Sequence, residues 1–62
     1  MKVSVYHIYS GDTDTYTGEV DQLRNQLNAA FPFLKKYNGA SLQDDLRKLS
    51  EQQALIVNVE DN

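Results

Sequence analysis

The chain has 62 residues and a net charge of −3, from six Lys and Arg against nine Asp and Glu. This length allows one domain, residues 1–62, with a small core, and the mild acidity argues against a general attraction to nucleic-acid phosphates. The absence of cysteine and the single histidine, His7, exclude disulfides and thiolate or histidine-rich metal sites, so no cofactor or metal is predicted.

The segment Val3–Tyr9 has the densest β-forming composition in the chain, and we predict that it is the central strand. A strand buried on one side alternates between apolar and polar residues, but this segment is partly apolar on both faces. One face carries Val3 and Val5, and the other carries Tyr6 and Ile8. The sequence therefore leaves open which face is buried.

Turn residues at positions 10–14 predict a hairpin whose second strand is Thr15–Thr17. The acidic residues of this loop, Asp12 and Asp14, suggest a calcium site. An EF-hand loop counted from Asp12 fails, however, because Thr17 replaces the required glycine and Leu23 replaces the required glutamate. We interpret the segment as a loop held by side-chain-to-backbone hydrogen bonds and keep a weak cation site as the alternative.

The first helix is predicted to begin at Gly18 or Glu19, with Thr17 as its N-cap. Pro32 disfavours helical geometry in the residue before it, so the helix is expected to end at Phe31. Its apolar residues recur at helical spacing and form one stripe: Val20, Leu23, Leu27, Ala30 and Phe31. This stripe is the strongest periodic signal in the sequence.

After the proline, the apolar residues within positions 33–37 predict a one-turn segment that lies over the end of the core. Ser41 begins an N-cap sequence, with Asp44 in place of the usual glutamate, and predicts a second helix over Leu42–Gln53. The last strand is predicted at Ala54–Val59. The predicted core combines one face of the first strand with Leu23, Leu27, Leu46, Leu49 and Val57.

These elements give an α+β domain of the order ββααβ. Each element is expected to reverse the direction of the chain, so the last strand is predicted to run parallel to the first and to pair beside it. The result is a three-stranded sheet of order 2-1-3 with two helices packed on one face. The other face is then uncovered, and it shows Ile56 with either Tyr6 and Ile8 or Val3 and Val5.

His7 is the one candidate for acid–base catalysis, and no nucleophile or second histidine lies near it in the sequence. The glycines are too far apart for a phosphate-binding loop, and so short a chain has few residues to spare for a substrate pocket. The protein is therefore predicted not to be an enzyme. With neither a signal-peptide core nor an apolar run of about 18 residues, it is predicted to be soluble and cytoplasmic.

The uncovered sheet face points to function, because a contiguous exposed apolar patch usually marks an interface. We predict an interaction surface of Tyr6, Ile8, Tyr9 and Ile56 that binds a protein partner. A homodimer that buries this face or pairs an exposed strand edge is a further prediction. In size, acidity and lack of a catalytic set, the chain resembles small regulatory or inhibitory proteins of phages and bacterial mobile elements, which implies a similar role.

The alternative is a single-stranded nucleic-acid-binding protein. Exposed sheet tyrosines, Tyr6 or Tyr9, would stack on bases, and a basic-aromatic patch would be supplied by Lys35, Lys36 and Tyr37. The acidic net charge and the absence of an RNP-like glycine-aromatic string argue against this alternative.

Overall fold

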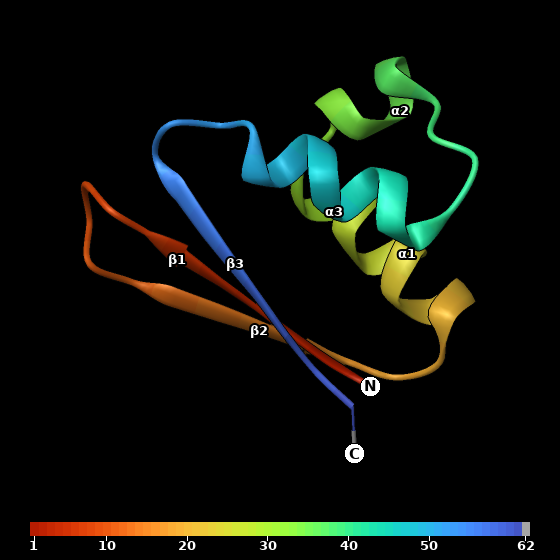
Figure 1. The fold of residues 1–62 in the computed structure, drawn as a ribbon, viewed down its shortest axis with the longest axis horizontal. Coiled ribbons are helices and arrows are strands. Elements are labelled where there is room, and N and C mark those ends of the chain that lie inside the picture. The colour runs from red at the N-terminus through yellow and green to blue at the C-terminus, as the bar shows by residue number, and fades with distance from the viewer. Residues whose placement is uncertain (62) are drawn as a thin grey trace.

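The computed structural model of the protein describes residues 1–61 and forms a three-stranded sheet with three helices (Figure 1). The elements in chain order are β1 (Lys2–His7), β2 (Thr13–Thr17), α1 (Val20–Ala30), α2 (Phe33–Tyr37), α3 (Leu42–Ser50) and β3 (Leu55–Glu60). The sheet has the order β2-β1-β3, so the α+β class, the central position of β1 and the predicted strand order are confirmed.

The predicted direction of the last strand is wrong, because β3 pairs with β1 in the antiparallel sense. The helix α2 and the connection after it return the chain to the end of the sheet where β1 begins. There the start of α3, at Leu42, lies beside Met1 and Val20. The helix α3 then carries the chain to the other end of β1, where Ile8 N–H donates to the Ala54 carbonyl. β3 therefore starts at that end and runs back along β1.

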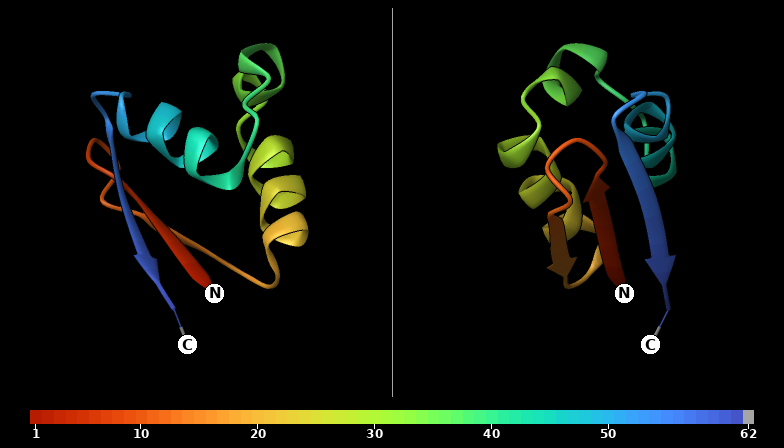
Figure 2. Two further views of the ribbon diagram at one scale, coloured as in Figure 1. Left: turned by 45° about the vertical axis from the view of Figure 1, so that its right-hand side comes forward. Right: turned by 90° about the vertical axis from the view of Figure 1, so that its left-hand side faces the viewer.

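All three helices lie on one side of the sheet, as the left view in Figure 2 shows. On this side β1 contributes Val3 and Val5, both 0% exposed, which settles which face of the first strand is buried. The register places Val57 opposite Val5, so the odd-numbered residues of β3 also face the helices. No helix among residues 1–61 covers the opposite face.

The core contains seven buried apolar residues: Val3, Val5, Leu23, Leu27, Leu34, Leu42 and Leu49. The predicted core members Leu46 and Val57 are only partly buried at its margin. Leu34 comes from α2, so the predicted one-turn segment over the core is confirmed. The helix α2 packs on α1 and α3, so α1 and α3 are the two helices that make the main contacts with the sheet, as predicted.

Several predicted boundaries shift, and β2 begins at Thr13 instead of Thr15. A Gly11 N–H bond to the His7 carbonyl, with Gly11 at φ 77°, turns the chain early, so β1 ends before Tyr9. The N-cap of α1 is Glu19 instead of Thr17, and its N–H donates to Gln22 Oε1 at 2.8 Å. The helix α3 ends at Ser50 instead of Gln53, where turn bonds from the Gln52 N–H to the Leu49 carbonyl and from the Leu55 N–H to the Gln52 carbonyl lead the chain into β3.

Candidate functional site

The uncovered sheet face carries an apolar group that we call the sheet patch, formed by Tyr6, Ile8 and Ile56. Tyr6 and Ile56 lie directly opposite each other on β1 and β3. The Ile8 N–H still donates to Ala54, so the strand alternation continues and places Ile8 on the side of Tyr6. The exposed fractions of the three residues are 39%, 44% and 55%. The structure thus brings three of the four predicted interaction residues together.

Tyr9, the fourth predicted interaction residue, does not belong to the sheet patch. It lies in the turn after β1 and is 88% exposed, so its ring has few contacts with the rest of the molecule. Strand alternation would place Tyr9 on the side of Val3 and Val5, opposite Tyr6, and β1 in any case ends before it. Tyr9 remains available to a partner, but its position is not fixed by the sheet.

The rest of the uncovered face is polar. Residues paired across the three strands form rows on this face. The row next to Tyr6 consists of Thr15, Ser4 and Asn58, and the row farthest from it consists of Thr17, Lys2 and Glu60. Lys2 Nζ lies 3.8 Å from Glu60 Oε2, which pairs the two charges of that row. The sheet patch is therefore a small apolar area at the hairpin end of the face, bordered by hydroxyl and amide groups. An apolar centre with a polar rim is the usual composition of a protein-binding surface.

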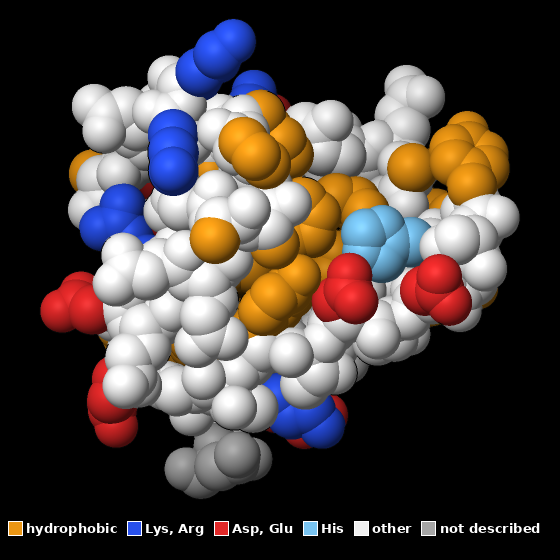
Figure 3. Space-filling view, turned by 180° about the vertical axis from the view of Figure 1, so that it is seen from behind, with side chains coloured by type: hydrophobic (Ala, Val, Ile, Leu, Met, Phe, Trp, Pro, Cys, Tyr) orange, Lys and Arg blue, Asp and Glu red, His pale blue; other side chains and the backbone are white. Residues whose placement is uncertain are grey.

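A second group of side chains lies on the helix side of the sheet and forms an aromatic cluster around Phe31. Its ring stacks on His7, at 6.2 Å between centroids and 19° between planes. Tyr16 and Phe33 contact Phe31 edge-on, at 6.5 and 6.3 Å. Figure 3 shows hydrophobic side chains in the hollow between the helices and the hairpin, with the histidine at the edge. The cluster fills the space where the end of α1 leaves the sheet.

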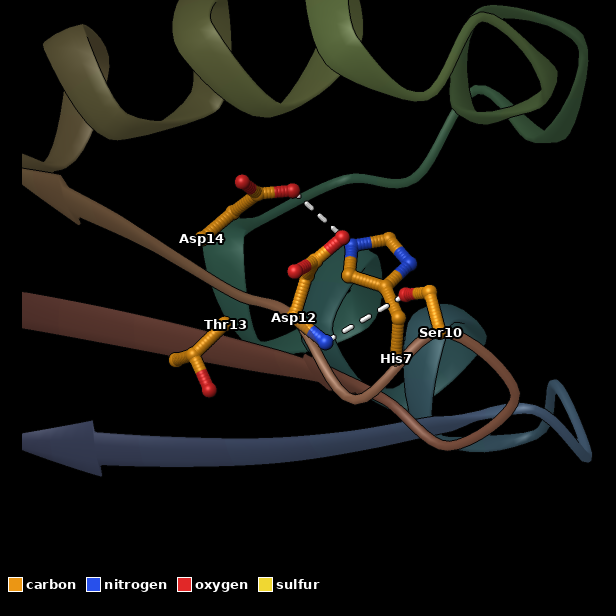
Figure 4. A pocket seen from close by; sticks show the side chains of 5 residues that line it. All are labelled: His7, Ser10, Asp12, Thr13 and Asp14. Carbon is orange, nitrogen blue, oxygen red and sulfur yellow. Dashed lines mark hydrogen bonds and ion pairs between the residues drawn. The ribbon is translucent and has the colours of Figure 1, made fainter.

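Beside this cluster, the hairpin loop lines a cavity of about 360 Å³ that is open to solvent. His7 and Asp14 point toward one another across it (Figure 4), with Nε2 2.8 Å from Oδ2. Ser10 Oγ accepts a hydrogen bond from the Asp12 N–H at 3.3 Å, which ties this hydroxyl to the loop backbone. A carboxylate that orients a histidine is half of a catalytic arrangement, and the cavity lining adds no nucleophile hydrogen-bonded to His7.

The His7–Asp14 pair was not expected from the sequence, where His7 is isolated. The register pairs Val5 with Asp14, and the His7 N–H donates to the Asp12 carbonyl. His7 and Asp14 are therefore diagonal neighbours on one face of adjacent strands, where side chains come within reach. The hairpin register is the signal that would have found the pair.

The structure gives the alternative cation site in the hairpin loop no support. Asp12 and Asp14 both line the cavity, but Asp14 is engaged by His7. Among residues 1–61, no three His, Cys, Asp or Glu side chains are placed to hold a metal ion together. In the described part of the chain, Asp12 and Asp14 therefore lack a third acidic, histidine or cysteine ligand placed beside them.

Tyr16 lies in the aromatic cluster with its phenol close to an acidic residue. Burial, and secondly the Asp14 carboxylate, raise the pKa of Tyr16 above its ordinary value of 10.0. The folded state thus favours the neutral phenol, and this stabilisation is present below the unfolded-state pKa and is lost as the pH rises through the folded-state pKa. We expect the free energy of unfolding to fall above about pH 10, and Tyr16→Phe to reduce this fall, in urea titrations at several pH values. An unchanged slope in the variant would contradict the assignment.

The residues of the nucleic-acid alternative lie away from the sheet patch. Lys35, Lys36 and Tyr37 belong to α2, which lies on the helical side of the sheet (Figure 2). Lys48 Nζ lies 5.3 Å from the centre of the Tyr37 ring, in a cation–π contact. The structure brings Tyr37 together with a lysine of α3, and it separates all three residues from Tyr6.

The helical layer contains a buried ion pair that was also not expected. Asp45 on α3 is 1% exposed, and its Oδ2 accepts a hydrogen bond from Arg24 Nε on α1 at 3.1 Å. Arg24 Nη2 donates to the Gly39 carbonyl at 2.7 Å. A Cβ atom at Gly39 would lie 2.8 Å from Asp45 Oδ1, so a side chain there would displace the buried carboxylate. This group, which we call the arginine clamp, joins α1, α3 and the connection after α2.

The aromatic cluster and the arginine clamp both join elements of the helical side of the fold, whereas the sheet patch lies on the uncovered face. Among residues 1–61, none of the helices has the length and apolar composition that spanning a bilayer requires. The chain matches no protein-family model, no curated protein and no solved structure. Its function is therefore argued from the geometry of its surface.

Proposed function

We propose that the protein is a non-enzymatic interaction module, a small regulator or inhibitor of the kind found in phages and mobile elements, and that it docks on a protein partner through the sheet patch. The observation that carries the proposal is the exposure of Tyr6 and Ile56 side by side on a sheet face that no helix covers. Large apolar side chains gathered on a rigid surface, with no fold role to occupy them, are typical of interfaces.

The residues of the uncovered sheet face indicate what kind of partner surface would bind to it. A tyrosine at its centre provides an apolar ring and a hydroxyl that can anchor in a pocket of the partner. The surrounding threonine, serine and asparagine side chains can donate and accept hydrogen bonds without the desolvation cost of a buried charge. The partner surface is therefore expected to be flat and uncharged, with one apolar pocket at the position of Tyr6.

The placement of the basic residues gives the nucleic-acid alternative no support. A single strand needs bases stacked on aromatic rings beside a positive groove for its backbone. The lysines of α2 and the tyrosine of the sheet patch lie on opposite layers, and Lys2, on the sheet face itself, is paired with Glu60. We therefore retain the protein-docking proposal alone.

The test is capture of a partner from a lysate of the native host, with a matched pair of tyrosine variants. Tyr6→Ser removes the centre of the sheet patch, and Tyr37→Ser removes a ring of similar exposure, 38% against 39%, on the other layer. We expect Tyr6→Ser and Ile56→Ser each to weaken binding of the captured protein at least tenfold, about 1.4 kcal/mol, in titrations. The Tyr37→Ser variant is expected to bind like the original protein.

Circular dichroism of each variant ensures that only folded proteins are compared. A partner that loses affinity for Tyr37→Ser but not for Tyr6→Ser would place the binding surface on the helical layer. Equal binding by all three variants would also contradict the sheet patch.

A further inference from the structure

The outer edge of β3 has backbone groups that no other part of the described chain uses. Ile8 N–H donates to the Ala54 carbonyl, so the bonded positions along β3 recur at every second residue and include Ile56 and Asn58. The N–H and C=O groups of Leu55, Val57 and Val59 therefore point away from β1. Among residues 1–61, the one internal bond at this edge is from the Leu55 N–H to the Gln52 carbonyl.

The side chains of β3 leave this edge unprotected. Exposed edges in natural proteins are usually blocked by lysine, proline, a bulge or a covering segment. The run Leu55–Val59 has no charge, no proline and no glycine, and Val59 is 43% exposed. A segment of this composition, with free backbone groups beside it, is suited to pair with another strand.

The opposite edge of the sheet, formed by β2, is different. Its Thr17 carbonyl already accepts a hydrogen bond from Gln26 Nε2 of α1, at 3.0 Å. It carries the charged Asp14 as its second residue, and threonine occupies every second position. This edge is partly capped and polar, so it is the poorer template of the two.

We propose that β3 pairs antiparallel with β3 of a second copy of the chain, which joins two sheets into one of six strands. This inference does not depend on the proposed function, because it uses the edge of the sheet and not its face. A second copy is the occupant because the segment is complementary to itself. A two-fold axis at Val57 places Val57 opposite its own copy and Leu55 opposite Val59.

This register gives both free N–H groups of the edge an acceptor. Each Val57 N–H donates to the Val57 carbonyl of the other copy, and each Val59 N–H donates to the opposite Leu55 carbonyl. Leu55, Val57 and Val59 then form an apolar row across the junction on the helix side, and no like charges lie opposite each other. The row buries Val59, which the single chain leaves exposed.

The size of the junction sets its strength. Strand pairing over six residues buries less than the roughly 1,200 Å² of a standard stable interface, so the dimer is expected to exchange with the monomer. Both sheet patches stay uncovered and lie on the same face of the joined sheet. The dimer therefore presents two copies of the proposed docking surface.

The test is light scattering behind size exclusion, from about 10 μM to 1 mM protein, where a weak dimer forms by mass action. The mass is expected to rise from 7.1 kDa toward twice that value. Val59→Pro removes an N–H that points outward, at a position where proline keeps the internal ladder intact, and this variant is expected to stay at the monomer mass. Thr15→Pro is the matched control, because its N–H points outward from β2, and it is expected to dimerise like the original protein.

Amide hydrogen exchange, followed residue by residue in NMR spectra, tests the same contact without a substitution. The Val57 and Val59 amides are expected to exchange more slowly as the concentration rises, while the outward amides of Thr13 and Thr15 are unchanged.

Four results would overturn the proposal. The first two are a mass of 7.1 kDa that persists to about 1 mM protein and a mass that grows beyond that of the dimer. The third is loss of the dimer in Thr15→Pro. The fourth is loss of the dimer in Ile56→Lys while folded Val59→Pro still forms it. The last result would indicate that the two copies associate through their sheet faces.

Discussion

Leu27→Ala is expected to lower the free energy of unfolding by about 2–5 kcal/mol and to leave most of the protein unfolded at room temperature. Leu27 is 0% exposed in the middle of α1, and its side chain fills the core beneath β1. Removing it costs the transfer free energy of the lost atoms and leaves a cavity that so small a core has few ways to close. Thermal melting and urea unfolding followed by circular dichroism measure the loss.

Leu46→Ala is the graded comparison for this prediction. Leu46 lies at the margin of the core and is only partly buried. The space left by its truncation is therefore open to solvent, and the buried cavity is smaller than the one left by Leu27→Ala. We expect a loss of about 1–2 kcal/mol, below the value for Leu27. A melting temperature for Leu27→Ala close to that of the original protein would show that the α1 stripe is not the centre of the core.

Arg24→Ala is expected to cost about 3 kcal/mol, through the arginine clamp. The substitution leaves the Asp45 carboxylate, 1% exposed, without its cation, and an unpaired buried charge is strongly destabilising. The cost falls at the low end of the range for buried pairs because the Arg24 side chain is 31% exposed and water can enter the space it leaves. The free Gly39 carbonyl adds to the loss.

The matched control for Arg24→Ala is Arg47→Ala. Arg47 forms a surface pair with Asp44, at 3.8 Å and with 69% of its side chain exposed, so its removal is expected to change stability by less than about 0.5 kcal/mol. Asp45→Asn combined with Arg24→Ala is expected to recover part of the loss, because the buried charge is then gone. Equal effects of Arg24→Ala and Arg47→Ala would contradict the role of the clamp.

The sequence was sufficient for those features that depend on local periodicity. The spacing of Leu23 and Leu27 predicted α1, and Ser41 was identified as the N-cap of α3, where its Oγ accepts the Asp44 N–H at 3.2 Å. The β composition of Val3–Tyr9 identified the central strand, and strand alternation grouped Tyr6 with Ile8 on one of its faces. These features need only the neighbours of each residue along the chain.

The features that were missed depend on contacts between distant segments. The direction of β3 is set by the path through α2, which local periodicity does not determine. Asp45 lies in the acidic first turn of α3, where a polar residue is expected, but Leu42, Asp45 and Leu49 also share a helical stripe. A charge on that stripe needs a partner, and only the tertiary packing of α1 on α3 shows that the partner is Arg24.

The pairing of β1 with β3 has a consequence for how the chain folds. Lys2 lies opposite Glu60, so this half of the sheet requires closure of a loop that spans nearly the whole chain, whereas the β1–β2 hairpin closes across a short turn. Loop-closure entropy opposes such long-range contacts, and proteins that depend on them fold slowly. We expect the hairpin to be formed in the folding transition state and β3 to dock after it. Substitutions in β3 would then mainly speed unfolding, while those in the hairpin would slow folding.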